Sequence, residues 1–193
     1  MMSDVISVLL SRNSTKAITG PGPNEAQLQQ ILATAMCAPD HGRLRPWRFK
    51  RIQGENIAHL ADLAVKAMAD EGRPLAENKE KNMREWLGRA PLVLAVGSYV
   101  DHSNDRIPQH ERLLATGAAV MNILNAAHAL GFGAFWSTGI GTYTDAVPEA
   151  LGFDPLEYEF LGFVVIGSLQ EPLAQKERPA VADHVTDWEP DLA

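Results

Sequence analysis

The sequence predicts a protein that mixes helices and β-strands in one chain, and three segments carry this prediction. The run APLVLAVGSYV, residues 90–100, is continuously apolar and rich in β-branched residues, which is typical of a strand buried on both faces. Residues 110–131 are rich in Ala and Gly and apolar on nearly every side, which indicates a helix surrounded by protein. The run YEFLGFVVIG, residues 158–167, predicts another strand. Because 46% of the 193 residues are hydrophobic, we expect residues 1–193 to form a single domain around a sizeable core.

The amino-terminal part of the chain predicts two helices with a loop between them. Apolar residues repeat at helical spacing across residues 4–12, and the polar run RNSTK follows them. The run TGPGPNEAQ interrupts regular structure with its Pro and Gly residues. Asn24 then provides an N-cap for a helix that we expect to end before Pro39.

The remaining elements follow from the same periodicities. We expect a short strand at residues 49–52 and helices at 55–71, 75–88 and 145–151. Gly131 and Gly133 are expected to end the long helix, and a strand is expected to start with FGAFWSTG. A chain of this size has little room to bury the long helix completely, so a partner subunit is its expected cover. The tail from Gln170 is polar and contains Pro, and we expect it to be disordered or wrapped on a second chain.

The composition argues against several classes of protein. A net charge of -7 does not suit a partner that is a nucleic acid or an anionic membrane surface, since both attract an excess of Lys and Arg. Cys37 is the only cysteine, which excludes an internal disulfide framework and fits a reducing compartment, so we expect the cytoplasm. Asp4 stands where a signal peptide needs positive charge, and no run of about 18 apolar residues predicts a transmembrane helix.

Two short cationic motifs lie far apart in the sequence. RNSTK, Arg12 to Lys16, gathers a guanidinium, two hydroxyls and an ammonium within five residues, which suits the binding of a phosphate. KERP, Lys176 to Pro179, places two cations in an acidic tail. Each motif alone has an ordinary alternative, namely a polar loop with a Ser or Thr cap for the first and a solvated charge pair for the second.

The loop CAPDHGRLRPWRF, residues 37–49, combines cationic and aromatic side chains. Its Pro and Gly residues fix an irregular path, so that a rigid loop can present polar groups to a ligand. We do not expect a metal at His41 and Asp40, because adjacent residues rarely converge on one ion and no Cys or His cluster completes the shell. For Trp47, a place in the core at the start of a strand is an equal alternative to ligand contact.

The glycine-rich run GFGAFWSTGIG, residues 131–141, permits close approach of the backbone to a flat or charged ligand. The run is not the dinucleotide fingerprint G-x-G-x-x-G, because its glycines precede a strand and Trp136 stands in the third glycine position. A helix C-cap and turn account for the first two glycines but leave Gly139 and Gly141 unexplained. The histidines His59 and His128 fall within helical patterns, which favours packing or surface roles.

In their order along the chain, these motifs resemble those of the FMN-dependent nitroreductase family, and the resemblance covers nearly all of the sequence. RNSTKAI resembles the family's Arg-x-Ser-x-Lys opening, CAPDHGRLRPWRF its loop that ends in Pro-Trp-x-Phe, GFGAFWSTG its late Gly-rich strand, and KERP its terminal Lys-x-Arg. The resemblance implies an α+β fold of three layers, with a central mixed β-sheet flanked by helices. It also implies an intertwined homodimer, packed through the long helix, with one FMN at each end of the interface.

The resemblance further implies a set of FMN-binding residues, carried over by position. In this set the phosphate is held by Arg12, Ser14, Lys176 and Arg178, and the pyrimidine edge is reached by Lys16. The partner subunit contributes Cys37 and His41 to the contacts with FMN. The ring is lined near N5 by Trp136, Ser137 and Thr138. Residues 126–131 correspond to a nicotinamide-nucleotide site. Asn13 belongs to the same opening motif, where the family commonly has Arg or His. In the 37–49 loop the family is expected to have Asn or Ser before Gln-Pro-Trp, and this chain has Arg43-Leu44-Arg45 instead.

The activity implied by the resemblance is that of an FMN-dependent oxidoreductase. The protein would take hydride from NADH or NADPH and reduce nitroaromatic compounds, quinones or related electrophiles by a ping-pong mechanism. The flavin N5 would carry the chemistry, so no catalytic side chain is required. Lys16 would stabilise the negative charge that develops near N1 and the C2 oxygen on reduction.

Two other functions stay open at this point. A non-catalytic flavin-binding sensor or storage module would use the same binding residues without redox turnover. A metal-dependent hydrolase would draw its ligands from four scattered residues, namely His41, His102, His110 and Glu111. A nucleophilic hydrolase has little support, since the sequence contains no G-x-S-x-G motif.

Overall fold

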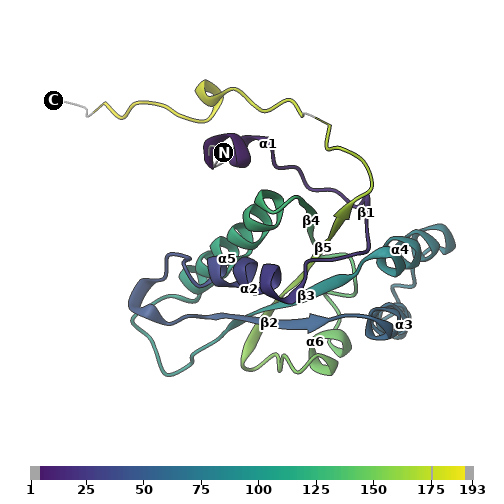
Figure 1. The fold of residues 1–193 in the computed structure, drawn as a ribbon. Coiled ribbons are helices and arrows are strands. Elements are labelled where there is room, and N and C mark those ends of the chain that lie inside the picture. Colours follow the sequence, from purple (N-terminus) through teal and green to yellow (C-terminus); the bar gives the residue numbers. More distant parts are fainter. Residues whose placement is uncertain (1–4, 175, 190–193) are drawn as a thin grey trace.

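The computed structural model describes residues 5–174 and 176–189, and its centre is a five-stranded sheet (Figure 1). The strand order is β1-β5-β3-β2, with β4 also paired to β5. These strands are β1 (Ile18–Thr19), β2 (Trp47–Ile52), β3 (Leu92–Tyr99), β4 (Phe132–Ser137) and β5 (Tyr158–Leu169). The named strands pair antiparallel, and an isolated bridge between Ser14 and Ala134 adds a parallel contact.

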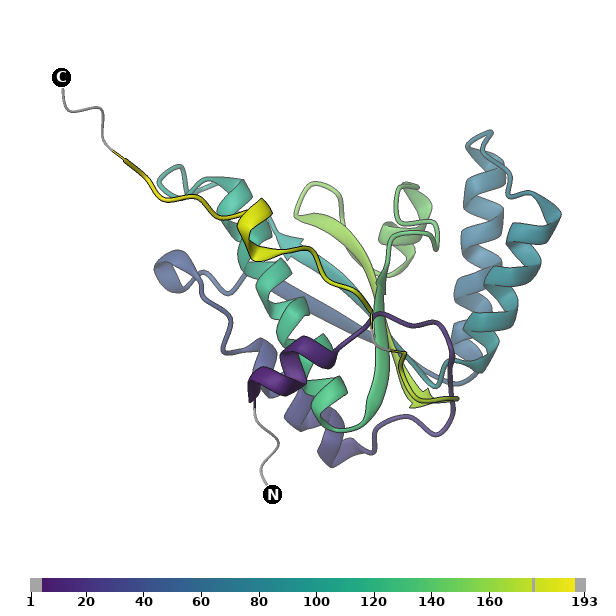
Figure 2. The same ribbon diagram turned by 90° about the horizontal axis from the view of Figure 1, so that it is seen from above.

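Helices cover both faces of this sheet and produce three layers (Figures 1 and 2). One outer layer contains α2 (Glu25–Ala35) and α5 (Gln109–Ala129), and the other contains α3 (Glu55–Asp70), α4 (Glu77–Arg89) and α6 (Ala146–Ala150). The helix α1 (Val5–Ser11) contacts α5, and single 3-10 turns occur at His41–Arg43 and Val181–Asp183. The α+β class and the three-layer arrangement are therefore confirmed.

The strand β3 shows how the sequence produces the central layer. Its side chains alternate between the two cores, because Val93 and Ala95 pack with α3 and α4 while Leu94 and Val96 pack with α2 and α5. Every residue of β3 except Tyr99 is buried. The predicted strand with two buried faces is confirmed, since helices exclude water from both sides.

The strand β2 begins two residues earlier than predicted. Trp47 opens this strand, is buried against α2 and α5, and donates its indole N–H to the Met36 sulfur at 3.4 Å. The core alternative for Trp47 is therefore the one confirmed. The two-residue strand β1 was not predicted from the sequence, because it is too short to show an alternating pattern.

The two glycines expected to end the long helix have different roles. Gly131 ends α5 with φ of 84°, as a C-terminal glycine does. Gly133 instead lies inside β4, where an added Cβ would come within 2.6 Å of a Leu169 methyl and 2.7 Å of an Ile18 methyl. That part of the prediction was wrong, since Gly133 permits close packing inside the sheet.

The long helix α5 spans Gln109–Ala129, close to the predicted residues 110–131. One face is buried against α2 and the sheet, but Leu114 is 70% exposed and Met121 is 46% exposed. Within the described residues, the helix is therefore covered on one side only. In the described part of the chain, no helix combines the length and the hydropathy that crossing a membrane requires.

The start of α2 is fixed by a capping box that Asn24 forms with Gln27. The Gln27 backbone N–H donates to Asn24 Oδ1 at 2.9 Å, and the Asn24 backbone N–H donates to Gln27 Oε1 at 3.0 Å. We expect Asn24→Ala to lower the free energy of unfolding by about 1 kcal/mol. Urea denaturation would measure the change, and Asn24→Ser, which keeps an accepting oxygen, is the control. Equal losses for both variants would contradict the capping role.

Candidate functional site

The loop Arg12–Lys16 runs directly beside β4. The Ser14–Ala134 bridge and the hydrogen bond from the Thr15 backbone N–H to the Ala134 carbonyl, at 3.4 Å, hold it there. This contact brings together the RNSTK motif and the glycine-rich strand, which are about 120 residues apart in the sequence. The predicted phosphate motif therefore lies alongside the strand that carries Trp136 and Ser137.

The chain segment after β5 returns to the same loop. Asn13 donates its side-chain amide to the Ala174 carbonyl at 2.8 Å, and it is buried there. Arg178 donates to the Arg12 carbonyl at 2.6 Å and to Asn13 Oδ1 at 2.9 Å. The structure thus joins the first and last motifs of the sequence, and Asn13 acts as the link between them. Arg178 is not the freely solvated cation of the ordinary alternative.

Arg12, Lys176 and Arg178 form a group of cations beside this loop, which we call the cation cluster. Burial lowers the pKa of the Arg12 guanidinium, and the nearby charge of Arg178 lowers it further. Within the described residues, no carboxylate forms an ion pair with any of the three. Cations that are held close together favour the binding of an anion.

Two hollows open beside the cation cluster, and both are lined by Asn13, Leu173 and Lys176. The larger has a volume of about 540 Å³ and is also lined by Arg178 and by residues of α1. The smaller has a volume of about 320 Å³ and is also lined by Ser14, Thr15 and the chain from Glu171 to Ala174. Ser14 Oγ lies 3.5 Å from the Arg12 guanidinium and can add a hydroxyl to an anion bound there.

Lys16 lies apart from the cation cluster. Its ammonium is 5.1 Å from the Trp86 ring centre and 5.7 Å from the Phe135 ring centre, so it rests over aromatic faces of α4 and β4. The side chain is exposed and forms no ion pair with a described carboxylate. Arg12 and Lys16 are four residues apart in the loop, and their side chains have different neighbours.

Trp136, Ser137 and Thr138 lie at the end of β4, with alternating exposure. Trp136 and Thr138 are exposed, and Ser137 is buried. The Trp136 indole N–H donates to the Leu161 carbonyl at 2.7 Å, which fixes the ring against β5. Beside them, Gly162 has φ of 90°, and an added Cβ would lie 2.4 Å from the Ser137 carbonyl oxygen. This glycine allows β5 to approach the turn after β4 closely.

Cys37 and His41 do not join the other predicted residues within one chain. Cys37 is exposed, and its thiol donates to the Ala33 carbonyl at 3.6 Å. His41 Nδ1 lies 2.7 Å from Glu111 Oε2, in the first turn of α5, whereas His128 near the cation cluster lies in the last turn. Seventeen helical residues span about 26 Å, so the two groups are at opposite ends of α5.

The arginines of the 37–49 loop differ in their contacts. Arg48 donates to the carbonyls of Arg45 and Trp47 at 2.7 and 2.9 Å, so it stabilises the loop itself. Arg43 and Arg45 are exposed and have positive φ values of 57° and 49°. The Asp40 carboxylate accepts the Arg45 backbone N–H at 2.6 Å, which makes Asp40 a turn residue here. The described residues contain no group of three His, Cys, Asp or Glu placed to hold a metal ion.

The sequence predicted a packing or surface role for His128, and its half-buried position in the last turn of α5 fits that role. His128 Nε2 lies 2.9 Å from Ser11 Oγ, and burial, followed by the charge of Arg12, lowers the pKa of His128. A lone histidine on an apolar helix carries no local signal of such a neighbourhood. Only the return of α1 along α5 places it beside Ser11.

Comparison with known proteins agrees with this arrangement. Residues 9–168 match the Nitroreductase family, so the chain belongs to this family of oxidoreductases. The Escherichia coli protein named "Putative NAD(P)H nitroreductase YdjA" is 33% identical over 170 residues, which cover 86% of this chain and 89% of that protein.

Solved structures show the same fold at lower sequence identity. The nitroreductase-like family protein from Bacillus cereus has a TM-score of 0.85 at 23% identity and covers 98% of both chains. A protein from Desulfovibrio desulfuricans, described as a "putative nitroreductase in complex with fmn", has a TM-score of 0.75 at 21% identity and covers 98% of this chain and 100% of its own.

Proposed function

We propose that the chain is an FMN-dependent oxidoreductase that takes hydride from NADH or NADPH and reduces nitroaromatic compounds, quinones or related electrophiles. The cation cluster carries this proposal, because Arg12, Lys176 and Arg178 lack carboxylate partners in the described chain and suit a phosphate dianion. The FMN complex of the Desulfovibrio protein and the name of YdjA support the choice of flavin and of nicotinamide donor.

The residues around the cluster fit the two ends of FMN. Arg12, Ser14, Lys176 and Arg178 would hold the phosphate, with Asn13 keeping the tail against the loop. Bound FMN would supply the redox chemistry by accepting a hydride and passing electrons to the acceptor.

The chain's own part in the reaction is to position the ring and to stabilise charge. Lys16 would place its ammonium where negative charge develops at the pyrimidine edge on reduction. Trp136, Ser137 and Thr138 would line the ring, with the close approach at Gly162 shaping that wall.

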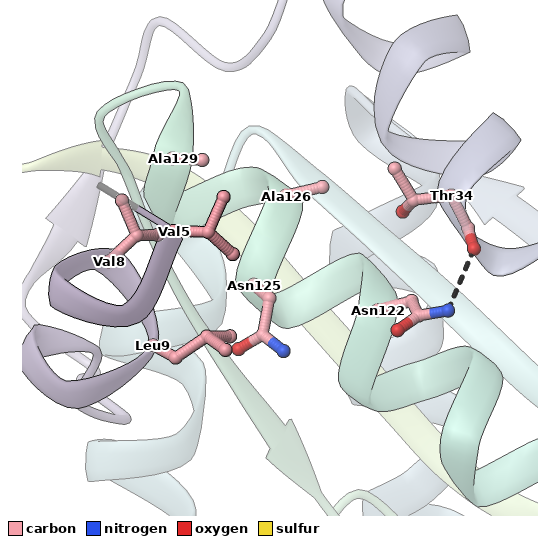
Figure 3. A pocket seen from close by; sticks show the side chains of 8 residues that line it. All are labelled: Val5, Val8, Leu9, Thr34, Asn122, Asn125, Ala126 and Ala129. Carbon is pink, nitrogen blue, oxygen red and sulfur yellow. Dashed lines mark hydrogen bonds between the residues drawn. The ribbon is translucent and has the colours of Figure 1, made fainter. Parts of the chain in front are cut away.

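We propose that two copies of the chain form the functional unit. The helix α1 has no buried residue, and Val5 and Leu10 are each 67% exposed. A hollow of about 300 Å³ lies between α1 and α5, and Figure 3 shows Val5, Val8 and Leu9 facing Asn125 and Ala126 across it. Apolar surface of this extent on α1 and α5 is costly to leave in water. A partner that covers it would also bring Cys37 and His41 of one subunit to the flavin of the other.

The dimer proposal predicts that light scattering gives the mass of two chains and that FMN raises the thermal midpoint of unfolding. FMN binding at the interface would stabilise the assembly by mass action, so the shift should grow with FMN concentration. Replacing Leu114 by Glu, which puts a charge on the exposed face of α5, is expected to favour the monomer. A folded monomer that carries FMN would contradict the proposal.

The reaction is predicted to show ping-pong kinetics. A single flavin face would serve the nicotinamide donor and then the acceptor, so the donor product leaves before the acceptor binds. Double-reciprocal plots of rate against donor concentration, at several fixed acceptor concentrations, should give parallel lines. Intersecting lines, which indicate a complex of both substrates with the enzyme, would count against this mechanism.

We also propose that residues 1–193 act as one FMN-binding domain in a reducing compartment such as the cytoplasm. The family match at residues 9–168, the return of the tail to the Arg12 loop and the exposed free thiol of Cys37 support this proposal.

A further inference from the structure

A hollow of about 590 Å³ is lined by residues of α2, the 37–49 loop and β2, and the proposed function gives it no role. It shares no lining residue with the two hollows beside the cation cluster. Its charged lining residues are Arg45 and Arg48, and its apolar lining residues are Leu32, Met36, Leu44, Trp47 and Phe49. A concave site with apolar walls and a few polar groups is typical of small-molecule binding.

The two arginines of this hollow differ in what their guanidinium groups bind. Arg48 Nη1 donates to the carbonyls of Arg45 and Trp47, and the Arg48 guanidinium carbon lies 5.7 Å from the Tyr99 ring centre. The Arg45 guanidinium forms no hydrogen bond or ion pair with any described residue. Arg45 is therefore the cation of this hollow that is available to a ligand.

The backbone of Arg45 is fixed from both sides. Its N–H donates to Asp40 Oδ2 at 2.6 Å, and its carbonyl accepts the Arg48 Nη1 donor at 2.7 Å. Arg45 has φ of 49°, which is uncommon for a residue other than glycine and persists only where the surroundings impose it. The same loop packs closely on Ile107, whose methyl would lie 2.5 Å from a Cβ added to Gly42. The backbone that carries the free guanidinium is thus in place before a ligand binds, which lowers the entropic cost of binding.

The carboxylates of the surrounding elements do not neutralise this arginine. Asp40 accepts the Arg45 backbone N–H, Glu25 of α2 is bonded to Gln29 and Arg51, and Glu111 of α5 lies 2.7 Å from His41 Nδ1. No acidic residue lines the hollow. Among the described residues, no carboxylate comes within ion-pair distance of Arg45 or Arg48. The charge of the lining therefore favours an anionic ligand.

We propose that this hollow is a second ligand site, separate from the cation cluster, and that it binds small molecules with an aromatic body and one carboxylate. A guanidinium binds a carboxylate through two parallel hydrogen bonds, and one free guanidinium matches one negative charge. The ring of Phe49 and the thioether of Met36 are suitable contacts for an aromatic body. The inference does not rest on the proposed function, because no flavin enters it.

The test is a calorimetric titration of the FMN-saturated protein with 1-naphthoate and with 1-naphthamide, which has the same ring system but no charge. The wild type is expected to bind 1-naphthoate more tightly. Arg45→Gln should weaken the binding of 1-naphthoate about fivefold, or about 1 kcal/mol for an exposed ion pair, and leave 1-naphthamide nearly unchanged. Arg43→Gln is the matched control, because Arg43 is also exposed, has φ of 57° and does not line the hollow. It should behave as wild type.

A second variant tests the apolar wall. Met36→Gln removes apolar surface from the hollow, and its side-chain oxygen can still accept the Trp47 indole N–H. This variant should weaken the binding of both ligands, since both would place their rings against that wall.

Four results would overturn the inference. The wild type could fail to bind 1-naphthoate, it could bind both ligands equally, Arg43→Gln could reproduce the loss seen with Arg45→Gln, or Met36→Gln could leave both affinities unchanged. A protein that takes up no FMN would instead contradict the proposed function. The same titrations on the flavin-free protein would then still decide whether the hollow binds an aromatic carboxylate.

Discussion

Replacing Arg12 by alanine is expected to weaken FMN binding by about one to two decades in dissociation constant while leaving riboflavin binding nearly unchanged. The loss of one charge-assisted contact to a phosphate costs about 1.5 to 3 kcal/mol, and each 1.4 kcal/mol is about tenfold in affinity. Fluorescence titration of FMN and of riboflavin would measure both constants. Lys79→Ala removes the same charge from an exposed position of α4 and serves as the control.

Arg178→Ala should produce a similar selective loss. Its guanidinium binds the Arg12 carbonyl and Asn13 Oδ1, so the variant removes a cation from the cluster and a contact between tail and loop. If Arg12→Ala lowers the affinity for FMN and riboflavin by the same factor, Arg12 supports the fold of the loop and not a phosphate. That result would leave the cation cluster without its proposed ligand.

Gly162→Ala is expected to lower the free energy of unfolding by about 3 kcal/mol or more and to reduce flavin content. Gly162 has φ of 90°, and the new Cβ would lie 2.4 Å from the Ser137 carbonyl oxygen, which is backbone and cannot rotate away. Relief of this clash requires β5 to move from the end of β4, where Trp136 and Thr138 are placed.

The control for this substitution is Gly131→Ala. Gly131 has a similar φ of 84° but no atom within 4 Å of an added Cβ, so its substitution reports the backbone strain alone, about 1 kcal/mol. Chemical denaturation of both variants would separate strain from steric clash. Equal destabilisation of the two variants would show that the approach to Ser137 is not critical.

Local patterns predicted those parts of the fold that depend on burial. The strand β3 and the helix α5 were predicted within two residues at each end, because a doubly covered strand and a packed helix have strong compositional signatures. The strand β1 and the role of Gly133 were not predicted, because they depend on packing between distant segments. No local pattern reports that Ile18 and Leu169 meet at Gly133.

The candidate site was predictable only in part for the same reason. The side-chain types in RNSTK suggested phosphate binding. The place of KERP in the same site was expected only from the family resemblance, because the contact between Asn13 and Arg178 joins residues that are 165 positions apart. The contact between His128 and Ser11 was not predicted, because it depends on how α1 lies along α5. The positions of Cys37 and His41 at a flavin depend on a second chain, and within one chain the structure places them at the far end of α5.

The central claim, that this chain binds FMN and uses it for redox turnover, is tested most directly by the absorption spectrum of the purified protein under anaerobic conditions. We predict a yellow protein with a flavin spectrum and about one FMN per chain, bleached by NADH or NADPH and restored by a quinone or nitroaromatic acceptor. A flavin spectrum that neither nucleotide bleaches would indicate a flavin-binding sensor or storage module. A colourless protein that does not take up added FMN would contradict the account as a whole.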